Sequence, residues 1–361
     1  MSRFEMNDDV TQASTIPSAF YTSDSVYEES KDKLFAKTWQ FITHIDNVKV
    51  PGQVYPFTLL EGCLDEPFVF TRGMDDQINC LSNVCTHRGN IVCEGAGNVQ
   101  SLRCRYHGKR FNLDGKMKFM PEFEDVQGFP SKADNLPEVP FAQWRQFLFA
   151  GVDPACPLDE YLAEVEERVG WMPIEEFVYD PGGQRDYLVK GHWALYCDNY
   201  LEGFHIPYIH ADLNEALDYG NYETILLKHG NLQLGVGSEG EECFDLPSGH
   251  IDEGQPIAAF YFWLYPNLML NFYPWGLSVN VVRPLGPDTT KVSFIPYVWD
   301  ESKRSAGAGG ELDRVEREDE AVVELVQKGV RSRFYDRGRF SPQRENGVHQ
   351  FHQMIAASMG D

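Results

Sequence analysis

Two short cysteine–histidine motifs constrain this chain more than any other feature of its sequence. The first motif places Cys85 and His87 on either side of one residue, and the second places Cys104 and His107 on either side of two. A glycine follows shortly after each histidine, where a tight turn can bring the backbone close to a bound group. We expect two loops that meet at one point and present two thiolates and two imidazoles.

This ligand set has two chemical interpretations. Two thiolates on one iron and two imidazoles on the other are the ligands of a Rieske [2Fe–2S] cluster, whose potential lies above that of a four-cysteine cluster. The same ligands suit a structural zinc ion. The close alternation of sulfur and nitrogen, and a spacer longer than most zinc knuckles use, favour the cluster. We therefore predict that Cys85, His87, Cys104 and His107 hold [2Fe–2S].

At these residues the chain resembles the Rieske-type non-haem iron oxygenases, the catalytic subunits of ring-hydroxylating dioxygenases and related monooxygenases and demethylases. Quinol-oxidising Rieske proteins carry an extra disulfide between their motifs, but Asn90 and Tyr106 occupy those positions here. Lys109 stands where many oxygenases have tryptophan. We expect that change to affect the docking surface more than the cluster.

We expect an α+β chain with three parts. Residues 1–39 are expected to form an N-terminal lead and helix. The resemblance covers roughly Trp39 to the end and implies an all-β Rieske domain over 40–155 and a helix-grip catalytic domain over 156–361, in which an antiparallel sheet wraps around a long helix. The residue patterns predict a flexible lead over 1–19 and a helix from Ser25 to about Trp39. Alternating or apolar runs predict strands at Val54–Leu60, Pro67–Arg72, Ile78–Val84, Thr224–Val236, Ala258–Leu264, Leu268–Tyr273, Ser278–Arg283 and Lys291–Trp299, with Asp114-Gly115 marking a hairpin.

A second metal centre is expected because a Rieske cluster only carries electrons, whereas O₂ chemistry needs a metal with open positions. Two histidines and one carboxylate provide such a site for Fe(II). His205 and His210 are five residues apart, which does not place them on one face of a regular helix. Pro207 between them would break or kink the helix and bring them together. The resemblance implies that both histidines bind iron.

The third ligand is expected on a helix over Glu311–Val330. An apolar stripe follows one face of this helix, and Asp319 interrupts it while Glu318 and Glu320 point away. A buried charge is costly unless it is paired or bound to a metal, so a buried ion pair is the alternative. The family's third ligand is an aspartate in this helix, which implies Asp319, with Glu316 as the fallback. The stripe comprises Leu312, Val315, Val322, Val323, Val326 and Val330.

Two further acidic residues precede the histidines. Glu202 lies three residues before His205, on the same face if the helix is regular. The resemblance implies that it links this histidine to a Rieske histidine of a neighbouring subunit, although aspartate is more usual there; a solvated acid is the alternative. Asp198, one turn further back, is a candidate for orienting His205.

The resemblance also implies the reaction. A separate reductase, possibly with a ferredoxin, would supply electrons from NAD(P)H, and O₂ would hydroxylate or N-dealkylate a small substrate within a homotrimer. The residue sequences of Asp198–His210 and Asn271–Gly276 are similar to those of the choline, carnitine and betaine-oxidising branch. This similarity favours a quaternary ammonium substrate. A ring hydroxylase of an aromatic compound is the alternative, and a non-catalytic electron carrier or binding module is more remote. Six aromatic residues are candidates for a cage around the ammonium group, and ordinary core packing is the alternative. They are Tyr261, Trp263, Tyr265, Phe272, Tyr273 and Trp275.

Composition excludes other classes of partner. The chain has 361 residues and a formal charge of −24, which argues against nucleic acid and anionic membranes. No apolar run is long enough to span a bilayer and the first residues are polar and acidic, so we expect a cytoplasmic protein. No glycine fingerprint of a dinucleotide site follows a strand, so the nicotinamide site is expected on another protein.

Overall fold

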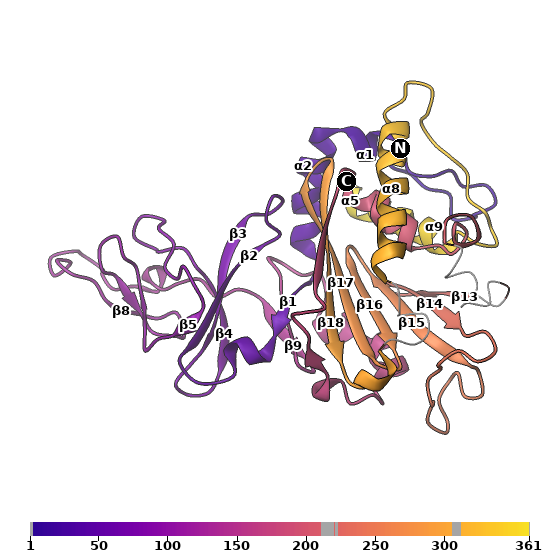
Figure 1. The fold of residues 1–361 in the computed structure, drawn as a ribbon. Coiled ribbons are helices and arrows are strands. Elements are labelled where there is room, and N and C mark those ends of the chain that lie inside the picture. The colour runs from indigo at the N-terminus through magenta and orange to yellow at the C-terminus, as the bar shows by residue number, and fades with distance from the viewer. Residues whose placement is uncertain (1–2, 211–219, 221–222, 305–311, 361) are drawn as a thin grey trace. The chain divides into compact units, whose positions relative to one another are not determined.

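The computed structural model describes residues 3–210, 220, 223–304 and 312–360. The chain divides into two compact units, one made of residues 36–158 and the other made of residues 1–35 together with 159–361. We call the first the cluster unit and the second the catalytic unit, after the candidate ligands that each contains. Figure 1 shows helices and β-sheets in the chain, and the predicted α+β class is confirmed.

The catalytic unit is built on one antiparallel sheet of eight strands. The strand order is β11-β18-β17-β16-β15-β14-β13, and β12 pairs with β18. The predicted antiparallel sheet is therefore confirmed, but the single strand expected over 224–236 is a hairpin, in which Leu227 pairs with Gly230. A side chain at Gly230 would lie against the carbonyl oxygen of Trp263, so glycine permits the neighbouring strand to approach closely. The strands are β11 Val178–Tyr179, β12 Arg185–Val189, β13 Glu223–Leu227, β14 Gly230–Val236, β15 Ile257–Leu264, β16 Leu268–Tyr273, β17 Gly276–Gly286 and β18 Thr289–Val298.

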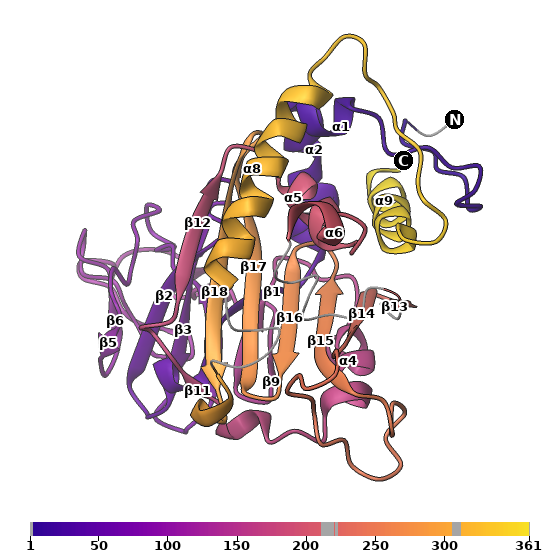
Figure 2. The ribbon, with the colours of Figure 1, turned by 45° about the vertical axis from the view of Figure 1, so that its right-hand side comes forward.

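Helices cover one face of this sheet. Figure 2 shows α8 (Leu312–Val330) lying along the sheet, with α5 (Trp193–Tyr200) and α6 (Ile206–Ile209) beside it. The long helix was expected to begin at Glu311, a residue that lies outside the described ones. Within the described ranges every helix is too short or too polar to cross a bilayer. The other helices are α1 Ala19–Thr22, α2 Asp24–Lys33, α3 Leu158–Tyr161, α4 Ala163–Val169 and α9 Asn346–Met359.

The N-terminal segment packs into the catalytic unit. Phe4, Ala13 and Ile16 are buried, and Ser14 forms a β-bridge with Arg339. The expectation of a flexible lead is therefore wrong for the described residues. Its apolar side chains, spaced too irregularly to signal a helix or strand, are covered by segments from the other end of the chain.

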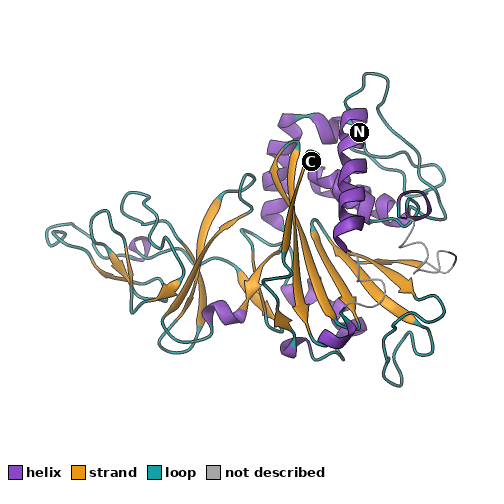
Figure 3. Cartoon of the chain, in the orientation of Figure 1, coloured by secondary structure: helices purple, strands orange, loops and turns teal. Residues whose placement is uncertain are grey.

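The cluster unit contains three small antiparallel sheets joined by long loops (Figure 3). The three strands predicted here are observed within one or two residues of their expected ends, and Asp114-Gly115 turns between β7 and β8. Cys85 and Cys104 belong to the unit's apolar core, which includes Val69, Leu81 and Phe111. The sheets are β1 Gln40–His44, β10 Phe147–Ala150 and β9 Phe141–Trp144; β4 Ile78–Ser82, β3 Glu66–Arg72, β2 Gln53–Leu59 and β5 Gly97–Asn98; and β6 Leu102–Arg103, β7 Arg110–Phe111 and β8 Met117–Phe119.

Candidate metal centres

The two cysteine–histidine motifs fold into loops of the same design. In the first loop the amide of Gly89 donates to the carbonyl of Cys85 at 2.9 Å, and in the second the amide of Gly108 donates to the carbonyl of Cys104 at 3.1 Å. Both glycines have positive φ angles, 69° and 77°, which side-chain-bearing residues rarely adopt. The glycines therefore let each loop turn back so that its thiol and its imidazole face the same point.

The four candidate ligands fit a Rieske cluster. The rings of His87 and His107 lie 4.7 Å apart, and the buried Nδ1 atom of each has no hydrogen-bond partner among the described residues. Both thiols are buried, and Asn90 donates to Cys104 Sγ at 3.6 Å. Burial raises the pKa of the Cys85 thiol, while the His87 amide and the Lys109 charge act in the opposite direction. Buried nitrogens without partners are costly unless they bind another group, and a cluster iron would satisfy both.

Lys109 does not lie on a docking surface. Its side chain is only 2% exposed, and its ammonium group lies over the rings of Phe111 and Phe129. The expectation that this departure from the family affects the surface more than the cluster is wrong. The sequence gives no sign of the burial, because a lysine in a loop is ordinarily solvated.

The second candidate centre brings together His205, His210 and Asp319. Asp319 Oδ1 lies 3.0 Å from His210 Nε2 and 3.5 Å from His205 Nε2, and one ligand atom from each residue falls within 4.8 Å of the other two. Burial alone would lower the pKa of His210, but the carboxylates of Asp319 and Glu318 outweigh it and raise that pKa. Two imidazole nitrogens facing one carboxylate are a donor set that fits Fe(II) with open positions.

The chain path around the histidines differs from a kinked helix. Helix α5 ends at Tyr200, and the separate short helix α6 begins after His205, with Pro207 in its first turn. Proline is well tolerated there because the first helical amides have no intrahelical partner. Glu202 therefore lies in the connection, not on the same helix face as His205.

A glutamate carboxylate contacts the Nδ1 atom of each histidine, the ring nitrogen that does not face Asp319. Glu202 Oε1 lies 2.7 Å from His205 Nδ1, and Glu202 Oε2 accepts from the His205 amide at 3.0 Å. Glu318 Oε2 lies 2.8 Å from His210 Nδ1, so the expectation that Glu318 points away is wrong. Such contacts fix the tautomer and leave Nε2 to face a metal. A one-face helix pattern could not identify Glu318, because it belongs to the neighbouring face.

The other acidic candidates have different partners from those expected. Glu316, the fallback ligand, accepts a hydrogen bond from the Tyr196 hydroxyl at 2.6 Å. Asp198, expected to orient His205, accepts from Tyr21 at 2.7 Å and lies 2.9 Å from His352 Nε2. Asp198 therefore joins α5 to α1 and α9, and Glu202 takes the orienting position beside His205.

The six candidate cage aromatics form three groups. Tyr273 and Trp275 stack with centroids 5.2 Å apart, and Tyr261 meets Tyr273 edge-on at 5.8 Å. Trp263 and Tyr265 contact Phe351 of α9, and Phe272 contacts Phe262. Tyr261, Tyr273 and Trp275 thus form one contact group, which we call the aromatic cluster.

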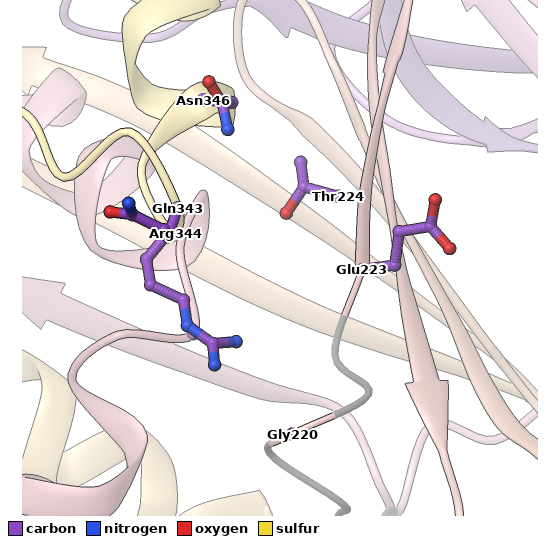
Figure 4. A pocket seen from close by; sticks show the side chains of 7 residues that line it. Gly220, Glu223, Thr224, Gln343, Arg344 and Asn346 are labelled. Carbon is purple, nitrogen blue, oxygen red and sulfur yellow. The ribbon is translucent and has the colours of Figure 1, made fainter. Parts of the chain in front are cut away.

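A polar pocket of about 350 Å³ lies at the start of α9. Figure 4 shows Gln343, Arg344 and Asn346 on one side and Thr224 of β13 facing them. Gly203, which follows Glu202, also lines the pocket. Sequence reasoning identified none of these residues, since they come from segments far apart in the chain.

Comparisons with known proteins match a family model to each part of the chain. A family described as "Ring hydroxylating alpha subunit (catalytic domain)" matches residues 170–361, and one described as "Rieske [2Fe-2S] domain" matches residues 38–130. Chloroplastic choline monooxygenase of Arabidopsis thaliana is 31% identical over 98% of this chain and 85% of its own length. The carnitine monooxygenase oxygenase subunit of Escherichia coli K12 is 28% identical over 97% of this chain and 95% of its own.

A solved structure shares the fold. A quaternary ammonium Rieske monooxygenase superposes on this chain with a TM-score of 0.80. Its structure was solved in connection with carnitine oxidation by gut microbiota and inter-subunit electron transfer. It is 24% identical, and the match covers 97% of both chains. The chain belongs to the Rieske non-haem iron oxygenase alpha subunits, in the branch of the choline and carnitine monooxygenases.

Proposed function

We propose that this oxygenase oxidises a small quaternary ammonium compound, and that His205, His210 and Asp319 hold the iron at which it does so. The observation that carries the proposal is the meeting of these three side chains within 4.8 Å. Iron bound there supplies O₂ activation, for which two histidines and one carboxylate leave positions open. Cys85, His87, Cys104 and His107 are proposed to hold the [2Fe–2S] cluster, in an electron-transfer domain over 40–155 that precedes a catalytic domain over 156–361.

Glu202 is proposed to serve the iron site in two ways. It holds His205 by two hydrogen bonds, at 2.7 and 3.0 Å, so that the imidazole keeps one orientation. Its carboxylate retains lone pairs that can accept a hydrogen bond from an imidazole of an adjacent subunit. A homotrimer would supply that subunit, and a separate reductase drawing on NAD(P)H would supply electrons.

The aromatic cluster supports the substrate class. Tyr261 and Tyr273 lie on the same sheet face as Asn271, because Tyr261 pairs with Asn271 and side chains alternate along β16. Tyr200 of α5 donates to Asn271 at 2.5 Å, so this face is the one that α5 covers. A quaternary ammonium is attracted to the faces of aromatic rings. The names of the choline and carnitine relatives point to the same class.

A single turnover tests the proposal. The chemically reduced protein would be exposed to O₂ with a panel of trimethylammonium compounds and aromatic acids, and the products followed by mass spectrometry. Formaldehyde, or an aldehyde together with trimethylamine, from an ammonium compound is the expected result. A hydroxylated ring with no ammonium turnover would overturn the substrate class in favour of ring hydroxylation.

Substitution of the aromatic cluster sharpens the test. Trp275→Leu removes a ring that is 3% exposed, and we expect the KM for the ammonium substrate to rise about tenfold with a smaller change in kcat. Trp299→Leu is the matched control, because Trp299 is 44% exposed and stacks on Phe177 outside the cluster. Equal effects of the two substitutions would argue against a cation site in the aromatic cluster.

A further inference from the structure

Lys109 joins the two loops of the candidate cluster site from within. It follows His107 by two residues, and its carbonyl oxygen accepts from the amide of Cys104 at 2.9 Å. Its ammonium group reaches the other loop and donates to Thr86 Oγ1 at 2.8 Å, between Cys85 and His87. A positive charge is therefore placed against the first motif and is shielded from water, since the side chain is 2% exposed.

The carboxylate of Asp134 pairs with the ammonium group of Lys109. Asp134 Oδ1 lies 3.3 Å from the ammonium nitrogen, and the Asp134 side chain is 22% exposed. Hydrogen bonds from Ser131, together with Lys109, lower the pKa of Asp134 and keep it ionised. The positive end of the pair is thus buried beside the ligands, while water screens the negative end more strongly.

We propose that Lys109 raises the reduction potential of the cluster and that Asp134 opposes it. The inference rests on the proposed [2Fe–2S] ligation. Reduction adds one electron, converts one ferric iron to ferrous, breaks no bond and lowers the net charge by one. A nearby cation stabilises that added negative charge, and local charge is one of the terms that set the potentials of iron–sulfur clusters. Lys109 is accordingly a positioning and tuning residue, not a ligand.

A purely structural role predicts something different. A lysine that only ties the loops together would change how much cluster the protein retains, without a signed effect on the potential. The charge effect predicts opposite signs for the two members of the ion pair. Removal of the cation lowers the potential, whereas removal of the anion raises it.

The experiment is a mediated redox titration of the full chain, with dithionite as reductant and ferricyanide as oxidant, followed by electron paramagnetic resonance. For Lys109→Met we expect the equilibrium constant for accepting one electron to fall about tenfold, equivalent to about 59 mV. Lys109→Arg keeps the charge and should stay within about twofold of the wild type. Asp134→Asn retains an acceptor for Ser131 and should raise the constant.

A control lysine and the cluster content make the outcome decisive. Lys116→Met removes a cation from the same unit, but Lys116 is 71% exposed and pairs with Asp114 at the surface, so no shift is expected. Equal potentials for Lys109→Met, Asp134→Asn and wild type, at full iron and sulfide content, would overturn the inference. If Lys109→Met loses its cluster, the sign of the Asp134→Asn shift decides. A wild-type chain without a cluster would overturn the proposed ligation itself.

Discussion

The two candidate metal centres use histidine in opposite ways. In the cluster unit, His87 and His107 turn Nδ1 inward, and these buried atoms have no hydrogen-bond partner among the described residues. In the catalytic unit, His205 and His210 turn Nε2 toward Asp319, and a carboxylate occupies each Nδ1. Backbone turns orient the first pair, whereas side-chain hydrogen bonds orient the second. A site that only carries electrons can be closed, while a site for O₂ needs ligands held firmly around open positions.

The comparison predicts that the centres can be emptied independently. Asp319→Ala should lower the iron content from about three to about two per chain and abolish turnover, because one ligand of the mononuclear site is lost. Acid-labile sulfide should remain at the wild-type level. Glu324→Ala, on the same helix, is the control and should keep both values. Loss of sulfide in Asp319→Ala would mean that the centres are not separate.

A smaller effect on iron binding is expected from substituting a carboxylate that contacts the Nδ1 atom of a candidate iron ligand, such as Glu318 beside His210. Glu318→Gln should weaken Fe(II) binding about tenfold, because the amide no longer accepts a charge-assisted hydrogen bond from His210. An anaerobic titration against a competing chelator measures the affinity, and Glu324→Gln is the matched control. An unchanged affinity would show that the tight contact at 2.8 Å does not orient the histidine.

A separate effect, on stability and not on metal binding, concerns a buried histidine outside both centres. Burial lowers the pKa of His192 to about 3. In the unfolded chain His192 takes up a proton below about pH 6.5, whereas in the folded chain it stays neutral down to about pH 3. The free energy of unfolding therefore falls as the pH drops from 6.5 toward 3. His192→Asn keeps an acceptor for the Ala194 amide and should lose about 2 kcal/mol less than wild type between pH 7 and pH 5. Denaturant unfolding at the two pH values measures this, and parallel losses would contradict it.

Short-range patterns predicted much of the fold. Strands such as Leu268–Tyr273 are observed as expected, because alternation and turn residues act within a few positions. The long helix was also expected, but its buried face was placed partly wrongly. Val326, assigned to the stripe, is 42% exposed, while Glu316 and Gln327 are buried with hydrogen-bond partners on α5 and the segment before it. An apolar-stripe argument overlooks polar residues whose partners lie elsewhere in the chain.

The sequence by itself indicated the ligand types of both candidate centres. Two cysteine–histidine motifs, a histidine pair around Pro207 and one aspartate in a helical stripe indicate both candidate centres without coordinates. The tertiary structure decided what surrounds them. Glu318 beside His210, the burial of Lys109 and the division of six aromatics into three groups all depend on segments distant in sequence. Ligand types follow from local composition, whereas burial and hydrogen-bond partners arise only when remote elements meet.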